Sequence, residues 1–507
     1  MSAETRSRPV NIGSVMVRNW SAICTAVALL LAAESAAAQS SDPLPAAAEK
    51  ALASNPEISA RFNAYRASMD AVAAARAAYR PRVDVNASIG KDYDRIGSRS
   101  PASQSLSRTG VGASVTQLLW DGLGTQSEVG RLSHDQLARY FELIDTTEQV
   151  VLEVARAQYD VMRFRRLVQL AEDNYVQHRY AFVQIQSRFK AGVGRGVDLE
   201  QAGARVALAE SNLSTEVANL HDVAARYQRV VGEAPPANLP QVSTMKRNLP
   251  GSASDAMTAA VRQNAAISAS IENLRAARAL VDGRNSAFQP RVEARLRSNA
   301  GHNVDGVRDQ SRDSAAEIVL NWNLYSGGAD QARVRQQVNL VNQAADQRDK
   351  ACRDARQTAA IAFNDTLKLN EQLVLLDRNA LAIEKARDAY RQQFDIGQRS
   401  LLDVLNAENE LYTAKRAYAN AEHDLALAYV RTHASMNQLG SQLGLSRAEA
   451  AATEAAAWVQ GEDAPARCVV IPISVKTTDR SELDARAQGL SANAPAAPGQ
   501  APPARKP

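Results

Sequence analysis

A mixed, mainly α-helical fold with long helical hairpins, four β-strands and an internal duplication is predicted by three features of this 507-residue sequence. Two segments, 124–190 and 329–394, contain no proline and almost no glycine, and each would form a helix about 100 Å long. Four shorter segments alternate apolar and polar residues, as strands with two different faces do. A glycine-containing stretch also occurs twice, with Phe, Gly and Asp at the same offsets, which indicates a repeat.

The composition suits packed helices more than a thick globular core, because only 5% of the residues are aromatic. The formal net charge is +4 without a basic cluster, so nucleic acid is not an expected partner. The six histidines show no metal-binding spacing, and the catalytic motifs of zinc peptidases and serine hydrolases are missing. Residues 192–196 resemble a phosphate-binding loop only loosely, because they follow a helix and not a strand. We expect no enzyme activity, cofactor or metal.

Residues 1–38 are expected to be a secretory signal peptide. Arginines at 6, 8 and 18 precede a short apolar run, and three alanines at 36–38 fit a cleavage site. A membrane anchor is the alternative, although the run is short for one. Cys24 would leave with the signal, and Cys352 and Cys468 are expected to be unpaired thiols, with a bridge between them left open.

The first repeat is expected over residues 39–231. It contains a helix at 46–78 with a break near Pro56, strands at 82–96 and 109–121, and the long helix at 124–190. A turn at 191–196 leads to a helix at 197–231, whose apolar residues recur every seven positions, as in coiled coils. The helices at 46–78 and 197–231, placed end to end, would match the long helix in length. The strands would therefore emerge at the end of the long helix that lies opposite the turn at 191–196.

A proline-containing linker at 232–253 separates this repeat from a second one at 254–439. The second repeat is expected to have a helix at 254–285, strands at 290–299 and 314–325, a long helix at 329–394, a turn at 395–400 and a helix at 401–439. Asn264 takes the place of Asn55. Residues 440–507 are rich in Ala and Pro and are expected to be a largely disordered tail, in which the apolar segment 468–475 could dock.

The four strands predict a barrel shared between subunits. Each strand has one apolar and one polar face, and an open sheet of this kind would expose its edges and an apolar surface. Membrane barrels need at least about eight strands, so the strands would close with those of other copies, with polar residues in the lumen and apolar residues toward lipid. A soluble periplasmic coiled-coil scaffold would explain the heptads but not these strands.

Three aromatic residues near the strand ends are expected to form a girdle at the membrane surface: Trp120, Trp322 and Tyr325. Ordinary packing of these aromatic side chains is the alternative interpretation.

The chain resembles the TolC-type outer-membrane channel family up to about Leu439. The resemblance rests on the duplicated helix–strand–strand–helix–helix plan and on the second turn, which Asp403-Val-Leu and Leu411-Tyr-x-Ala-Lys follow. It implies a homotrimer with a twelve-stranded barrel in the outer membrane and a helical tunnel in the periplasm. It also implies docking to an inner-membrane transporter, of the ABC or RND type, through a periplasmic adaptor.

The same resemblance places a gate at the periplasmic end of the tunnel. Arg399 matches the linking arginine of the family, Asp198 its acidic partner and Asp403 a constriction aspartate. Phe394 stands where a tyrosine is typical and Asn406 where a second constriction aspartate is typical, so the latch and the acidic ring would both be weaker. Alternatively, the two aspartates are helix-start acids and Arg399 is a surface charge.

The tips of the hairpins are the expected adaptor contacts. Their glycines, which permit the φ angles of a reversal, are Gly192, Gly194, Gly196 and Gly397. The segment 429–439 resembles the protein-secretion branch of the family more than the drug-efflux branch. The missing lipid-anchor cysteine favours the same branch. We therefore expect export by type I protein secretion, with multidrug efflux as the alternative.

Overall fold

The computed structural model describes residues 43–95, 97–98, 100–239, 244–304, 308–445, 457–471, 475 and 478–492. The expected signal peptide lies outside these residues. The chain divides into two units, Met1–Cys468 and Val469–Pro507, and the second contains helix α12 (Arg480–Ala492). All the elements discussed below belong to the first unit.

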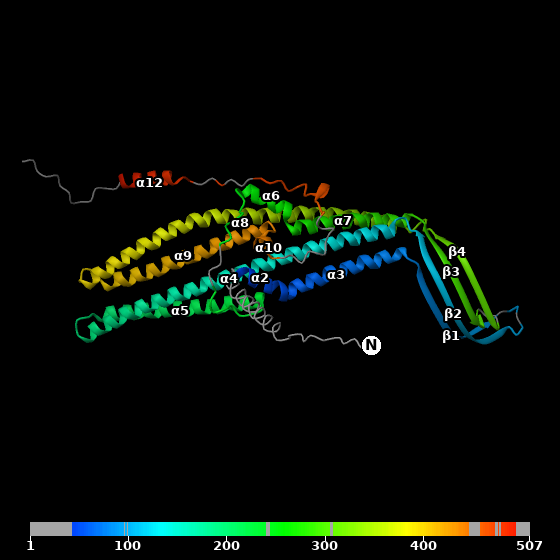
Figure 1. The fold of residues 1–507 in the computed structure, drawn as a ribbon, viewed down its shortest axis with the longest axis horizontal. Coiled ribbons are helices and arrows are strands. Elements are labelled where there is room, and N and C mark those ends of the chain that lie inside the picture. The colour runs from blue at the N-terminus through cyan, green and yellow to red at the C-terminus, as the bar shows by residue number, and fades with distance from the viewer. Residues whose placement is uncertain are drawn as a thin grey trace, which may run out of the picture. The chain divides into compact units, whose positions relative to one another are not determined.

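The first unit confirms the predicted fold class, with long helical hairpins, four strands and a duplicated order of elements (Figure 1). The first repeat consists of α2 (Pro43–Ser54), α3 (Pro56–Arg76), η1 (Ala77–Tyr79), β1 (Arg82–Arg95), β2 (Ser103–Trp120), α4 (Gly124–Lys190) and α5 (Gly196–Val231). The second consists of α6 (Ala253–Gln263), α7 (Ala265–Asn285), η2 (Ser286–Phe288), β3 (Arg291–His302), β4 (Gln310–Asn321), α8 (Ala329–Asp395) and α9 (Leu401–Ser435). The short helices α10 (Leu439–Gln442) and η5 (Gly461–Asp463) follow.

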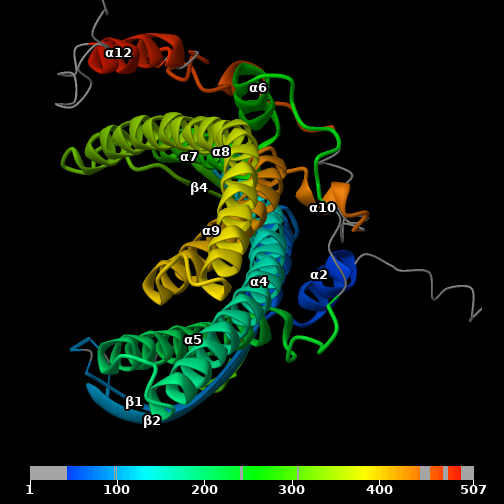
Figure 2. The ribbon, with the colours of Figure 1, turned by 90° about the vertical axis from the view of Figure 1, so that its left-hand side faces the viewer.

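The two long helices form the spine of the first unit. Helix α4 packs against α5 over one part of its length and against α3 over another, and α8 packs in the same way against α9 and α7. Contacts of α4 with α7 and α9 join the two repeats into one curved layer (Figure 2). The largest apolar cluster lies where α2, α4, α5, α9 and α10 meet, and its fully buried members include Val151, Val154, Val231, Val430 and Leu439. None of the described helices is both long and apolar enough to span a membrane.

The four strands form one antiparallel sheet in the order β1-β2-β3-β4. A row of neighbours on one face consists of Arg82, Thr116, Arg295 and Glu317. The adjacent row, on the other face, consists of Val83, Val115, Leu296 and Ala316. The sheet therefore has a polar and an apolar face. Within the described chain, β1 and β4 each pair on one side only, so both edges are open.

Each of the predicted helices at 46–78 and 254–285 is divided by an asparagine. Asn55 and Asn264 adopt nearly the same extended conformation, with φ of −71° and −67° and ψ of 122° and 123°. The side chain of Asn55 accepts a hydrogen bond from the N–H of Glu57, and that of Asn264 accepts one from Ile267. An asparagine in this conformation caps the helix that follows, and this explains the break in both repeats.

The strands also differ from their predicted limits. β2 begins at Ser103 and not at residue 109, because the polar segment before it pairs with β1 up to Arg95 opposite Ser103. A ladder of backbone hydrogen bonds tolerates polar side chains at a sheet end exposed to water, so composition alone suggested a longer loop. β4 ends at Asn321, so Trp322 and Tyr325 lie beyond the strand.

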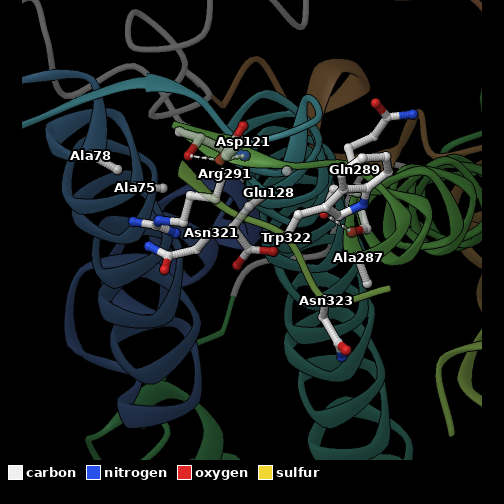
Figure 3. A pocket seen from close by; sticks show the side chains of 14 residues that line it. Ala75, Ala78, Asp121, Glu128, Ala287, Gln289, Arg291, Asn321, Trp322 and Asn323 are labelled. Carbon is white, nitrogen blue, oxygen red and sulfur yellow. Dashed lines mark hydrogen bonds between the residues drawn. The ribbon is translucent and has the colours of Figure 1, made fainter. Parts of the chain in front are cut away.

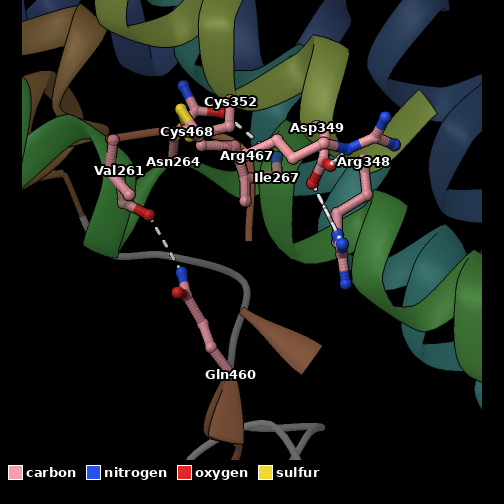
Figure 4. The surroundings of a disulfide bond; sticks show 9 residues. All are labelled: Val261, Asn264, Ile267, Arg348, Asp349, Cys352, Gln460, Arg467 and Cys468. Carbon is pink, nitrogen blue, oxygen red and sulfur yellow. Dashed lines mark hydrogen bonds and ion pairs between the residues drawn. A yellow bond between two sulfur atoms is a disulfide. The ribbon is translucent and has the colours of Figure 1, made fainter. Parts of the chain in front are cut away.

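The prediction of unpaired cysteines is wrong, since Cys352 of α8 and Cys468 form a disulfide bond (Figure 4). The segment before Cys468 packs on α6, α7 and α8, which brings two cysteines 116 residues apart in sequence into contact. Part of the tail that was expected to be disordered is therefore ordered. The spacing of the cysteines left a bridge open without favouring it, and docking was expected only from Cys468 onward and not for the residues before it.

Candidate functional site at the hairpin tips and the strand–helix junction

Both tips end the long helix in the same way. The N–H groups of Gly192 and Val193 bond to the carbonyls of Phe189 and Arg188, at 2.9 and 3.1 Å. The second tip has the same pattern: the N–H groups of Gly397 and Gln398 bond to the carbonyls of Phe394 and Gln393, at 3.0 and 2.8 Å. Gly192 and Gly397 have positive φ angles of 78° and 76°. These are Schellman motifs, which require a left-handed residue that glycine supplies without strain.

The first tip contains two more glycines with different surroundings. A Cβ atom on Gly194 would lie 2.7 Å from the backbone nitrogen of Phe189, so only glycine fits there. A Cβ atom on Gly196 would make an ordinary contact of 3.7 Å with the Phe189 ring. Gly194 therefore sets the tight return of the chain, whereas Gly196 begins α5.

Asp403 and Arg399 interact with each other at the second tip. Asp403 forms a capping box with Ser400, in which the Ser400 Oγ accepts from the Asp403 N–H and the carboxylate accepts from the Ser400 N–H, each at 3.3 Å. Arg399 lies 3.7 Å from the same carboxylate, donates to Gln393 at 3.1 Å and stacks on Tyr390, 4.6 Å from its ring centre. Asp403 thus acts as a helix-start acid, as the alternative interpretation held, and it is paired as well.

Asp198 lies in the first turn of α5, and no hydrogen bond or ion pair joins its side chain to another of the described residues. Arg399 and Asp198 are therefore not brought together within one chain. Any link between these two side chains would have to join different copies of the chain.

Asn406 has a partner that sequence reasoning missed. Arg205 of α5 donates a hydrogen bond of 2.7 Å to the Asn406 side chain of α9, across the boundary between the two hairpins. His178 of α4 is 2% exposed, and burial together with the charge of Arg205 lowers its pKa to about 4. The asparagine at 406 thus belongs to a contact that holds the hairpins side by side. Arg205 stands among alanines and valines of α5, and only its position in the heptads could have marked it as inward-facing.

Phe394 packs between the hairpins near the tips. It adjoins a buried cluster of Ile185, Ala202, Leu401 and Leu405, which come from α4, α5 and α9. The guanidinium of Arg188 lies 5.1 Å from the Phe394 ring centre, within the range of a cation–π interaction. Phe394 therefore makes apolar contacts at the position where the family resemblance implies a tyrosine with its hydroxyl group.

The junction between strands and long helices uses two successive left-handed residues in each repeat, Gly122-Leu123 and Gly327-Gly328. In the first repeat, Asp121 accepts a hydrogen bond of 2.8 Å from the Thr125 N–H and so caps α4. A cavity of about 760 Å³ lies beside this corner and is lined by α3, α4, α7 and the end of β4 (Figure 3). Arg291, Glu128 and Trp322 are among its lining side chains (Figure 3).

The aromatic residues predicted for a girdle lie at this junction. Trp120 ends β2 and is 43% exposed, whereas Trp322 and Tyr325 follow β4 and are 54% and 84% exposed. The Trp322 indole donates to the carbonyl of Phe288 at 3.1 Å. Tyr79 and Phe288, 50% and 44% exposed, occupy equivalent places just before β1 and β3. Sequence reasoning missed both, although an aromatic residue two positions before Pro-Arg-Val occurs in each repeat.

Comparison with known proteins identifies the family to which the chain is similar. The family model described as outer membrane efflux protein matches residues 47–233 and 257–438. The chain is 27% identical to the outer membrane efflux protein BepC of Brucella suis, over 81% of this chain and 88% of BepC. It is 23% identical to the alkaline protease secretion protein AprF of Pseudomonas aeruginosa, over 56% of this chain and 60% of AprF. The solved outer membrane protein VceC of Vibrio cholerae has a TM-score of 0.69 at 15% identity, over 78% of this chain and 96% of VceC.

The long hairpins and the four-stranded sheet with its apolar face have the fold of solved outer-membrane proteins such as VceC. The chain belongs to the outer membrane efflux protein family, and the resemblance stated from the sequence is confirmed. Proteins of this family are outer-membrane channels and not enzymes; they are trimers with a helical periplasmic tunnel, and they work with adaptors and inner-membrane transporters. No cluster of potential metal ligands occurs among the residues whose structure is described.

Proposed function

We propose that three copies of this chain form a channel-tunnel for type I protein secretion, which receives its cargo from an inner-membrane transporter and a periplasmic adaptor. The observation that supports assembly is the open four-stranded sheet. Three copies supply twelve strands, enough to close a membrane barrel, and closure pairs the free edges of β1 and β4 between neighbours. The exposed apolar face, with Val85 73%, Ile89 87% and Ile318 73% exposed, would then contact lipid.

The relatives support secretion and efflux to different degrees. BepC is named an efflux protein, and AprF is named a protease secretion protein. The resemblance of segment 429–439 to the secretion branch favours protein cargo, and efflux of small molecules is the second candidate because BepC is matched over more of the chain.

We propose a gate at the tips, built from Arg399, Asp198, Asp403, Asn406 and Phe394. Asp198 has no partner within its own chain among the described residues, whereas Arg399 is held at the second tip by Asp403 and Tyr390. A carboxylate without a partner in the first turn after a hairpin tip suits a link to the neighbouring copy. Such exposed pairs contribute only about 0–1 kcal/mol each, so a binding partner could release them.

Contacts with the adaptor and with the membrane surface follow from the same geometry. The two Schellman turns expose backbone at the extreme end of each hairpin, which suits Gly192, Gly194, Gly196 and Gly397 as adaptor contacts. Trp120, Trp322 and Tyr325 gather at the end of the sheet nearest the helices, which suits a girdle at the periplasmic membrane surface.

Two measurements test this function. The mass of the detergent-extracted protein should correspond to three chains, and it should conduct ions in planar bilayers; a monomer without conductance would refute the channel. In a strain that lacks the gene, loss of one or more proteins from the culture medium is expected. Unchanged secretion with raised sensitivity to toxic compounds would replace secretion by efflux.

A further inference from the structure

The ordered segment 457–468, here called the strap, joins helices from both repeats. Its Gln460 side chain donates to the carbonyl of Val261 on α6 at 2.9 Å (Figure 4). Arg275 of α7 donates to the carbonyls of Val459 and Gln460 at 3.2 and 3.0 Å. The strap therefore lies across the break between α6 and α7, at the place where Asn264 interrupts the helix.

An aromatic side chain anchors the start of the strap. The ring of Trp458 packs 4.7 Å from that of Phe141 on α4, and its indole donates to Glu272 of α7 at 2.6 Å. Glu272 is completely buried and also pairs with His134 of α4 at 2.7 Å. Burial alone would raise the pKa of Glu272, but the hydrogen bonds from His134 and Trp458 outweigh it and keep the pKa below its usual value. The carboxylate therefore stays charged and links α4, α7 and the strap.

Charged groups fix the rest of the strap. Asp463 accepts from Arg275 at 2.7 Å and also pairs with Arg278, and its carbonyl accepts from Arg348 of α8 at 3.0 Å. Arg467 donates to Asp349 at 2.7 Å (Figure 4). It also pairs with Asp346. The ion pairs thus bring the strap to α8 directly beside Cys352.

The disulfide at the end of the strap is buried when the strap is seated. Cys352 is 0% and Cys468 is 8% exposed, and both belong to a buried cluster with Ile267 and Ile271. An oxidant or reductant has to reach a sulfur atom directly, because thiol–disulfide exchange proceeds by attack of a thiolate on sulfur. The bond can therefore form or break readily only before the strap is fully seated.

We propose that the strap is a clasp locked by oxidation after export, and that this chain is a substrate of a thiol–disulfide oxidant in the periplasm. The Cys468 thiolate, on the segment that has still to dock, attacks the disulfide of the oxidant, and one thiol of the oxidant leaves. The Cys352 thiolate then attacks Cys468 in the mixed disulfide and releases the second thiol. The chain loses two electrons and two protons, and the oxidant disulfide is reduced to a dithiol.

The shielding of the bond can be measured on the purified full-length protein in detergent. Free thiols are labelled with a maleimide polymer after exposure to dithiothreitol, and the labelled bands are separated on a gel. We expect reduction at least ten-fold slower in the native protein than in denaturant, and at least three-fold faster in Arg467→Ala than in the native wild type. Arg378→Ala, which removes an exposed arginine of α8 away from the strap, should match the wild type. Equal rates in the native and denatured proteins, or no effect of Arg467→Ala, would overturn the clasp.

The need for an oxidant is tested in cells with and without the periplasmic thiol–disulfide oxidant. When the oxidant is missing, we expect the wild-type chain to carry free thiols. We also expect the amount of its oligomer that survives heating before gel analysis to fall by at least half. The variant with both Cys352→Ser and Cys468→Ser should contain the same amount of oligomer in both strains. A fully oxidised wild type without the oxidant, or an equal loss in the double variant, would overturn the proposal. The thiol state is read whether or not the channel conducts, so this result is independent of the proposed function.

Discussion

Side chains at the second tip both stabilise the start of α9 and belong to the proposed gate. Asp403 caps α9 and lies 3.7 Å from Arg399, and both side chains are partly exposed. An exposed pair of this kind contributes about 0–1 kcal/mol to stability. Loss of Arg399 should therefore leave the fold intact, so that its effect on the channel can be seen separately.

Arg399→Ser should raise single-channel conductance in planar bilayers, because it removes a cation that would link neighbouring hairpins. Arg378→Ser, an exposed arginine further along α8, is the matched control and should conduct as the wild type does. If Arg399→Ser also conducts like the wild type, Arg399 has no place in the gate.

His178 should make stability depend on pH. Burial and Arg205 lower its pKa from 6.5 to about 4, so the folded chain keeps the ring neutral while the unfolded chain takes up a proton. Stability should therefore fall as the pH drops from 6.5 toward 4, by at most about 3.5 kcal/mol per chain at about 1.4 kcal/mol per pKa unit.

Thermal unfolding in detergent across this pH range measures the effect. His178→Gln should flatten the decline, and His221→Gln should leave it unchanged because the His221 side chain is 85% exposed. A decline as steep in His178→Gln as in the wild type would show that other groups cause it.

At the scale of secondary structure, the two tips share one hydrogen-bond pattern but differ in packing. Gly194→Ala would place a methyl group 2.7 Å from the Phe189 nitrogen, and the backbone would have to shift. Overpacking of this kind costs about 1–3 kcal/mol, so amide hydrogen exchange around residues 188–196 should become faster. Gly130→Ala, in a helical position with open space around it, should not speed exchange at the tip. Unchanged exchange in Gly194→Ala would contradict the tight return.

The long helices and their tips could be predicted from sequence because they follow from local composition. Helix α4 spans Gly124–Lys190, a segment without proline in which glycine occurs only near its start. The break at Asn264 was harder to see, since no proline follows it as Pro56 follows Asn55. The start of β2 depends on pairing with β1, and pairing is set by the fold and not by local polarity.

Contacts between distant segments could not be predicted at all. The Arg205–Asn406 bond joins residues 201 positions apart, and the Cys352–Cys468 bond joins residues 116 positions apart. No local pattern encodes such pairs, because they depend on how α5, α8 and α9 and the strap pack. The resemblance to the family marked Asn406 as a site, but not its partner.

At the scale of the whole molecule, the apolar face of the sheet should be the face that enters the bilayer. Leu296→Arg should strongly reduce outer-membrane assembly, because an arginine on the lipid face costs about 2–4 kcal/mol per chain near the membrane midplane. Ser311→Arg places the same charge on the polar face, opposite Gly301, and should assemble normally. Fractionation of membranes followed by gel analysis of the trimer distinguishes the two variants. Normal assembly of Leu296→Arg would show that this face does not contact lipid.

The duplication also constrains whatever contacts the end of the tunnel. Each chain has one tip that begins its return helix at Arg195 without a side-chain cap and one that begins it at Ser400 with a capping box. Three chains would therefore display six ends of two alternating kinds around the ring. A ring of six identical adaptor subunits would have to engage them in two distinct ways, so neighbouring adaptor subunits could not all bind equivalently.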